Sequence, residues 1–198
     1  MNIVYESADN FIKITNKKYR FIVSHKRKTQ EIILDFYPSD YRHATGLHYI
    51  TDIVIERNPV KLIDAILKEP YMVTDEILDK SKKYNEISPY TGSIKERLSD
   101  MRFLESCLDS SDYIRIYQIQ PFGSIIGADY FIESFCKEIK SNVYIFIRKR
   151  EESDTYVIVS FFRKSVLFKG TSIYWMLKEK ITDKGVIELY RHSNYKNM

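Results

Sequence analysis

Two histidines, two threonines and a glycine lie close together in residues 37–52, which read YPSDYRHATGLHYITD. His43 follows Arg42 directly, and Thr45 and Gly46 come just after it. An imidazole titrates near neutral pH, so His43 is suited to take up or release a proton. The guanidinium of Arg42 and the backbone amides around the glycine are suited to contact an anion. The alternative is an ordinary turn in which these side chains only satisfy backbone groups.

A second group of candidate residues interrupts an apolar run near the end of the chain. Arg163, Lys164 and Ser165 lie inside residues 156–168, which read YVIVSFFRKSVLF. Two cations and a hydroxyl at the end of a strand are a combination that binds phosphate. The alternative is a charged strand end at the surface of the protein.

Metal and nucleotide chemistry find little support in the sequence. It contains no Walker loop and no G-x-G-x-x-G, G-x-S-x-G or H-E-x-x-H motif. His43 and His48 are five positions apart, which on a helix would set their rings about 140° apart, on different faces. Asp129, Glu138 and Lys140 have the loose spacing of Mg²⁺-dependent nucleases, a pattern that is common by chance. We therefore predict neither a metal site nor a cofactor.

Helix signals dominate the middle of the chain. Residues 57–70 begin with Asn58 as N-cap and Pro59 at the first helical position, and Pro70 is expected to end the helix. Residues 74–84 start with a threonine cap and an acidic first turn, which predicts a second helix.

The strongest helix signal lies in residues 92–108. Ser93 and Glu96 have the spacing of a capping box. The apolar residues repeat at steps of three and four, which predicts one buried face. They are Ile94, Leu98, Met101, Leu104 and Leu108.

Strand patterns flank these helices on both sides. Before them, a polar link joins residues 19–26 and 30–37 into a predicted hairpin. After them come strand-length apolar or alternating segments at 113–119, 128–136, 142–149, 155–162 and 185–192, with 172–181 ambiguous between strand and helix. The predicted fold class is α+β, in which an N-terminal hairpin and helices precede a mainly antiparallel sheet.

Length and charge set broad limits. The 198 residues fit a single domain, 1–198, and the net charge of +4 permits nucleic-acid binding without arguing strongly for it. Cys107 and Cys136 have no metal-binding or redox spacing. No signal peptide and no membrane-spanning run is found, so we expect a cytoplasmic protein without membrane contact.

Together these segments resemble one family. DFYPSDYRHATGLHYI resembles the signature of a phage and mobile-element branch of the BECR-fold nucleases, named for barnase, EndoU, colicins E5 and D and RelE. The matching pieces are the first strands, the H-x-T-G turn at 43–46, the helical middle, Ala128-Asp129, and Lys164-Ser165 on a strand end. The similarity covers residues 18–170, and Ala44 stands where a larger apolar residue is expected.

The resemblance implies a BECR-like α+β domain that cleaves RNA without metal. The ribose 2′-hydroxyl attacks the neighbouring phosphate, a step that needs proton transfer and stabilisation of the phosphorane charge. Expected catalytic residues are His43, as acid or base, Lys164 and Ser165; expected substrate-binding residues are Arg42, Thr45 and Arg163. The implied partner is RNA, whether transfer, messenger or guide RNA.

Two other functions stay open at this point. In the first alternative, the protein is a phage-encoded inhibitor of a bacterial defence ribonucleoprotein and resembles an anti-CRISPR protein. Such an inhibitor acts by binding the ribonucleoprotein or by cutting its guide RNA. A nuclease-like fold kept only for RNA binding would bind in a salt-sensitive way and yield no product.

Overall fold

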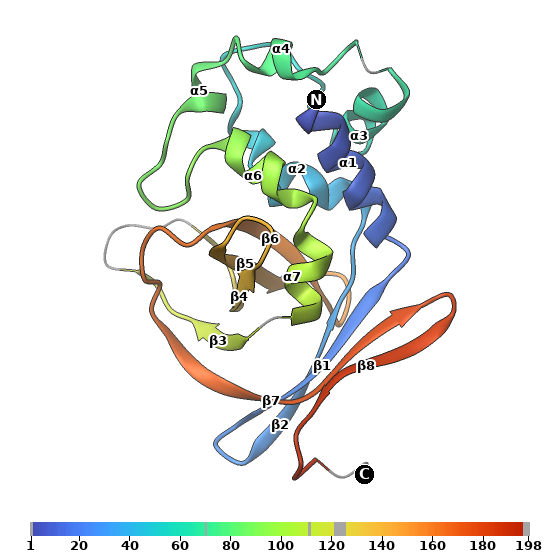
Figure 1. The fold of residues 1–198 in the computed structure, drawn as a ribbon, viewed down its shortest axis with the longest axis vertical. Coiled ribbons are helices and arrows are strands. Elements are labelled where there is room, and N and C mark those ends of the chain that lie inside the picture. Colours follow the sequence, from blue (N-terminus) through green and yellow to red (C-terminus); the bar gives the residue numbers. More distant parts are fainter. Residues whose placement is uncertain (1, 70, 111, 121–125, 196–198) are drawn as a thin grey trace.

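A helix, a hairpin, a run of short helices and six further strands follow one another along the part of the chain that the structure describes (Figure 1). The computed structural model describes residues 2–69, 71–110, 112–120 and 126–195. The elements are α1 (Ile3–Ile14), β1 (Lys18–His25), β2 (Lys28–Leu34), η1 (Pro38–Asp40), α2 (Tyr41–Ala44), η2 (Leu47–Tyr49), α3 (Pro59–Lys68), α4 (Asp75–Leu78), α5 (Lys82–Asn85), α6 (Ile94–Met101), α7 (Leu104–Ser110), β3 (Tyr113–Tyr117), β4 (Tyr130–Cys136), β5 (Ser141–Lys149), β6 (Thr155–Arg163), β7 (Gly170–Thr182) and β8 (Gly185–Arg191).

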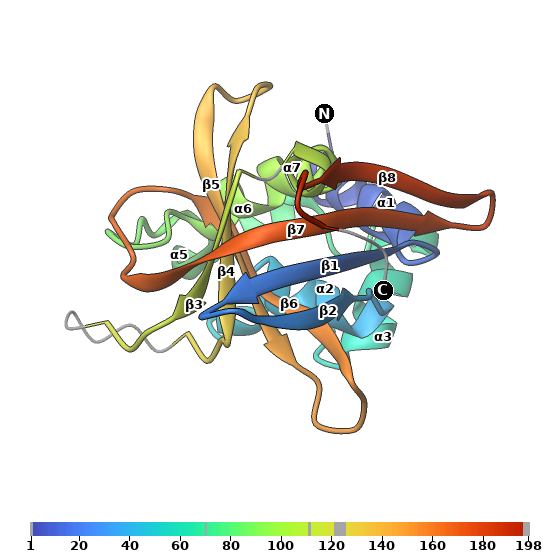
Figure 2. The same cartoon turned by 90° about the horizontal axis from the view of Figure 1, so that it is seen from below.

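Seven of the strands close into a barrel. Their order is β1-β2-β6-β5-β4-β3-β7, and β7 pairs back onto β1, beside which it runs in Figure 2. Neighbours are antiparallel except β2 and β6, which are parallel over two residue pairs. Closure removes the free strand edges that an open sheet would expose. β8 pairs with β7 outside the closed ring.

The predicted grouping of a hairpin, helices and then antiparallel strands is present, whereas closure into a barrel was not predicted. The predicted hairpin is β1–β2, and the ambiguous segment 172–181 lies in β7. Helix α1 was not predicted, although the Asn2 side chain caps it by accepting a hydrogen bond from the backbone N–H of Tyr5.

The predicted helices exist, but two of them are broken. Asn58 caps α3 as expected, while Pro70 lies outside the described residues. The segment 74–84 forms two short helices, because the Ser81 hydroxyl accepts a bond from the N–H of Tyr84 and starts α5. Residues 92–108 form α6 and α7, which divide after Met101.

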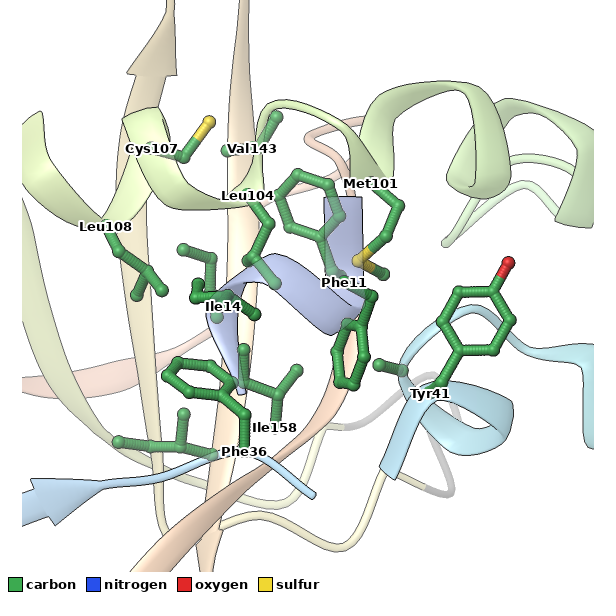
Figure 3. Packing of buried hydrophobic residues seen from close by; sticks show 14 of the residues in the cluster. Phe11, Ile14, Phe36, Tyr41, Met101, Leu104, Cys107, Leu108, Val143 and Ile158 are labelled. Atoms are coloured by element: carbon green, nitrogen blue, oxygen red, sulfur yellow. The ribbon is translucent and has the colours of Figure 1, made fainter. Parts of the chain in front are cut away.

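Helices cover one face of strands β4, β5 and β6, and aromatic side chains cover the other. Side chains of α1, α6 and α7 form the main core with strand residues that include Val143 and Ile158 (Figure 3). The opposite face carries a cluster of Phe131, Tyr144, Phe146, Phe162 and Phe168. These strands are therefore buried on both sides, which explains why they read as apolar runs.

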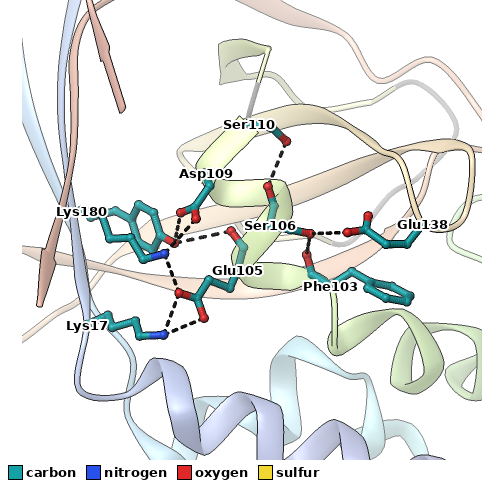
Figure 4. Close-up of polar contacts among 9 residues, drawn as sticks. Lys17, Phe103, Glu105, Ser106, Asp109, Ser110, Glu138 and Lys180 are labelled. Atoms are coloured by element: carbon teal, nitrogen blue, oxygen red, sulfur yellow. Dashed lines mark hydrogen bonds and ion pairs between the residues drawn. The ribbon is translucent and has the colours of Figure 1, made fainter. Parts of the chain in front are cut away.

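Helix α7 is tied to the barrel by charged groups. Glu105 accepts from Lys17 at 2.7 Å and from Lys180 at 2.5 Å, and Asp109 accepts from the Tyr19 hydroxyl at 2.6 Å (Figure 4). These bonds join one helix to β1 and β7, the two strands that close the ring. In the part of the chain that is described, no helix has the length and apolar character needed to cross a membrane.

Candidate active site

A tight turn after β2 carries the histidines. Helix α2 ends at Ala44, and Gly46 then takes a left-handed conformation with φ of 83° before η2 begins. The Thr45 hydroxyl donates to the carbonyl oxygen of Tyr41 at 2.7 Å and closes the turn. A left-handed residue here suits glycine, because other side chains pay a steric penalty in that conformation.

An arginine at the end of β5 fixes the base of this turn. The Arg150 guanidinium donates to Asp35 Oδ1 at 2.9 Å and to Asp40 Oδ2 at 2.6 Å. It also lies over the Tyr37 ring, 4.0 Å from the ring centroid. Because both carboxylates are nearly buried, this network holds residues 35–40 firmly against the barrel.

The turn brings the two histidines together. The ring centroids of His43 and His48 are 4.5 Å apart, and the rings are inclined by 39°. The expectation that these rings face apart is wrong, because it assumed a continuous helix, whereas the left-handed Gly46 reverses the chain between them. His48 Nδ1 lies 3.3 Å from the Arg42 carbonyl oxygen, so Nδ1 carries the proton when it donates there.

Beside the histidine pair lies a cavity of about 710 Å³ between the turn and the strands β5 and β6. Its lining includes His43, His48, Tyr49, Arg148 and Ser160. Arg148 is exposed and has no ion pair among the described residues, so its charge is available to a ligand. The volume is in the range of cavities that bind small molecules or parts of polymers.

Burial and neighbouring cations keep both imidazoles neutral. Partial burial lowers the pKa of His43 below its usual value, and the charges of Arg42 and Arg148 lower it further against the opposing effect of Asp40. Burial lowers the pKa of His48 to about 4. At neutral pH the pair therefore offers unprotonated nitrogens next to a free guanidinium, a combination suited to remove a proton beside a phosphate.

Arg42 and Thr45 lie in the turn but do not line this cavity. The Thr45 side chain is fully buried, and its hydroxyl already bonds the Tyr41 carbonyl. The Arg42 Nε is buried without a hydrogen-bond partner in the described part of the chain. Contact of either side chain with substrate stays a prediction, and the structure shows Thr45 shaping the turn.

The second predicted group lies away from the cavity lining. Arg163 donates to both oxygens of the buried Asp100, at 2.6 and 2.8 Å. Lys164 binds Glu133 at 2.5 Å, and Ser165 is exposed after β6. The structure does not bring these side chains to the histidine pair, so their catalytic and binding roles stay predictions.

Asp129 and Glu138, the loosely spaced acidic residues of the sequence, do not lie together. Asp129 precedes β4 and Glu138 follows it, so the two carboxylates lie at opposite ends of the strand. Within the described ranges, no group of three or more His, Cys, Asp or Glu side chains is placed to hold a metal ion.

His48, Arg148 and Ser160 line this cavity and were not predicted as site residues. His48 was set aside on helical spacing, although a glycine between two histidines was a signal for a reversal of the chain. Arg148 lies in the positively charged end of a predicted strand. Charge at a strand end does not indicate which residues the Arg148 side chain faces. Ser160 lies inside an apolar run, and nothing in the sequence marks it.

Comparison with known proteins places this site in a family. The family model described as phage-Barnase-EndoU-ColicinE5/D-RelE like nuclease4 matches residues 3–194. No curated protein and no solved structure matches the chain. Because the family match covers nearly the whole chain, the protein belongs to this family of phage BECR-like nucleases, which confirms the resemblance found in the sequence.

Proposed function

We propose that the protein is a metal-independent endoribonuclease whose active site is the cavity beside His43. The observation that supports this most directly is the contact of the His43 and His48 rings in a cavity of about 710 Å³. The cavity is also lined by Arg148, which has no ion pair among the described residues. Membership of a nuclease family makes phosphodiester cleavage the relevant chemistry. An imidazole and a guanidinium meet the needs of a reaction in which a ribose hydroxyl is the nucleophile.

In the proposed reaction, His43 takes the proton of the ribose 2′-hydroxyl while the oxygen attacks the adjacent phosphorus. The new 2′-O–P bond replaces the P–O5′ bond, and His43 returns its proton to the departing 5′-oxygen. The products are a 2′,3′-cyclic phosphate and a 5′-hydroxyl. Arg148 balances the negative charge that develops on the phosphorane. His48 contacts the His43 ring and orients it.

The test is cleavage of total bacterial RNA in EDTA by wild-type protein and by His43→Ala. We expect wild-type fragments that end in 2′,3′-cyclic phosphate and a loss of about 10²-fold or more in rate for the variant. His25→Ala is the matched control, since His25 lies at the end of β1 and outside the cavity lining. Equal melting temperatures of the three proteins exclude unfolding as the cause.

Two outcomes would contradict the proposal. Unchanged cleavage by His43→Ala would remove His43 from the mechanism. Intact RNA after incubation with folded wild-type protein would remove the ribonuclease and leave the inhibitor of a defence ribonucleoprotein as the function to test. Lys164→Ala and Ser165→Ala belong in the same assay, because a loss of rate with unchanged melting would give these residues the catalytic roles predicted from sequence.

A further inference from the structure

A second cavity adjoins the proposed active site. It has a volume of about 350 Å³ and shares Tyr49, Ile126 and Ser160 with the first cavity. Its other walls come from residues 83–94 and from Arg97 of α6. Because three residues line both spaces, the two cavities are neighbours.

Arg97 is a buried cation in the wall of this cavity. Only 6 % of its surface is exposed. Its Nε donates to the Thr91 carbonyl oxygen at 3.2 Å, and one terminal nitrogen reaches Ser160 Oγ at the long distance of 3.5 Å. A guanidinium has five N–H groups, so these two contacts with described residues leave further N–H groups of Arg97 for a ligand.

No carboxylate neutralises Arg97 among the described residues. Two other partly buried arginines, Arg150 and Arg163, are each bound by buried aspartates. Glu86 lines the same cavity as Arg97, but its carboxylate is paired with Lys83 at 2.7 Å. Arg97 therefore lacks the carboxylate partner that Arg150 and Arg163 have.

The charge of Arg97 persists despite its burial. Burial lowers the pKa of Arg97 to about 10, so the side chain stays protonated at neutral pH. The guanidinium lies over the Phe162 ring, 5.2 Å from its centroid, which offsets part of the lost hydration but supplies no negative charge. A buried cation without a counter-ion is unfavourable, and an anion bound in the cavity would remove that cost.

We propose that Arg97 binds a phosphate of the RNA that flanks the phosphate being cleaved, and that the second cavity is this flanking subsite. The proposal rests on the proposed function, which supplies the polyanionic ligand. The planar fork of arginine matches two oxygens of a phosphate. Lys83 also lines the cavity, where its ammonium group is paired with Glu86.

The test uses deoxydinucleotides, which lack the 2′-hydroxyl and cannot be cleaved by the proposed route. Binding of an equimolar mixture of sequences is compared with binding of the same mixture carrying an added 5′- or 3′-terminal phosphate. We expect one added phosphate to tighten binding to wild-type protein by about 10- to 100-fold, the effect of hydrogen bonds to a charged group. Arg97→Gln should abolish this gain.

Two further variants serve as controls for the binding experiment. Arg148→Gln is the matched control: it should weaken binding of both probes and keep their ratio, because Arg148 faces the central phosphate. Arg97→Lys keeps the charge and loses the fork, so it should retain part of the gain if Arg97→Gln fails to fold. Absence of any gain in wild-type protein, or a full gain in Arg97→Gln, would overturn the subsite.

The two proposals fail in different ways. RNA cleaved in EDTA together with no gain from an added phosphate would overturn the subsite and leave the nuclease. A gain that depends on Arg97 together with intact RNA would overturn the nuclease and leave the anion site.

Discussion

Replacement of Arg163 should leave a buried carboxylate without its cation. The sequence predicts a substrate-binding cation, whereas the structure places its guanidinium in a two-bond pair with Asp100. The Asp100 side chain is 1 % exposed, and that of Arg163 is 41 % exposed. The carboxylate is thus buried and depends on this arginine for its neutralisation.

Arg163→Ala should therefore destabilise the fold. Removal of one partner from a buried ion pair costs about 3–5 kcal/mol, and the lower end applies here because water reaches one side of the arginine. A loss of about 3 kcal/mol lowers the melting temperature by roughly 6–12 °C in a chain of this size. Replacement of both residues, Asp100→Leu with Arg163→Met, should recover most of that loss because no unpaired charge stays buried.

The assay is thermal and urea unfolding of Arg163→Ala and of the double variant. RNA cleavage is measured in parallel at a temperature where all of them are folded. We expect a lower melting temperature for Arg163→Ala and cleavage close to that of wild-type protein. A melting temperature within about 2 °C of wild type for Arg163→Ala, with cleavage strongly reduced, would refute the structural assignment and support substrate binding.

Two further predictions concern the turn and its charges. Cleavage should fall as the pH drops through the lowered pKa of His43, because protonation removes the base. Arg148→Gln should move this acidic side of the pH–rate profile to higher pH, because it removes a positive charge that favours the neutral imidazole. An unchanged pH–rate profile for Arg148→Gln would show that Arg148 does not affect the pKa of His43. Gly46→Ala should lower the free energy of unfolding by about 1–2 kcal/mol, because φ at this position is 83° and the new Cβ would lie 3.0 Å from a terminal nitrogen of Arg97. Thermal unfolding measures this loss, and an unchanged melting temperature would contradict the predicted backbone strain.

Local signals in the sequence were reliable where neighbouring residues decide the structure. The Asn58 cap, the Ser93–Glu96 capping box and the β1–β2 hairpin all depend on contacts within a few residues, and all are present. Helix lengths were less predictable. Residues 92–108 kept their buried face but divided into two helices, a break that their periodicity did not indicate.

Barrel closure could not be predicted in the same way. The pairing of β1 with β7 joins residues 150 to 163 positions apart, from Ser24 with Tyr174 to Lys18 with Ile181. The parallel contact of β2 with β6 joins another distant pair. Strand patterns specify which face is buried, but they do not name a partner strand. The exposed charges of β5 likewise gave no sign that Arg148 faces the histidines.

The sequence by itself determined the family, the fold class and the turn that carries His43, because these follow from local patterns and from the family resemblance. Only the tertiary structure decided which charges are free. It pairs Arg163 and Lys164 with carboxylates from distant elements, and it leaves Arg97 and Arg148 without such partners among the described residues. The reason is physical: whether a cation is available to a ligand depends on the groups that the fold brings within a few ångströms of it, and spacing along the chain does not record them.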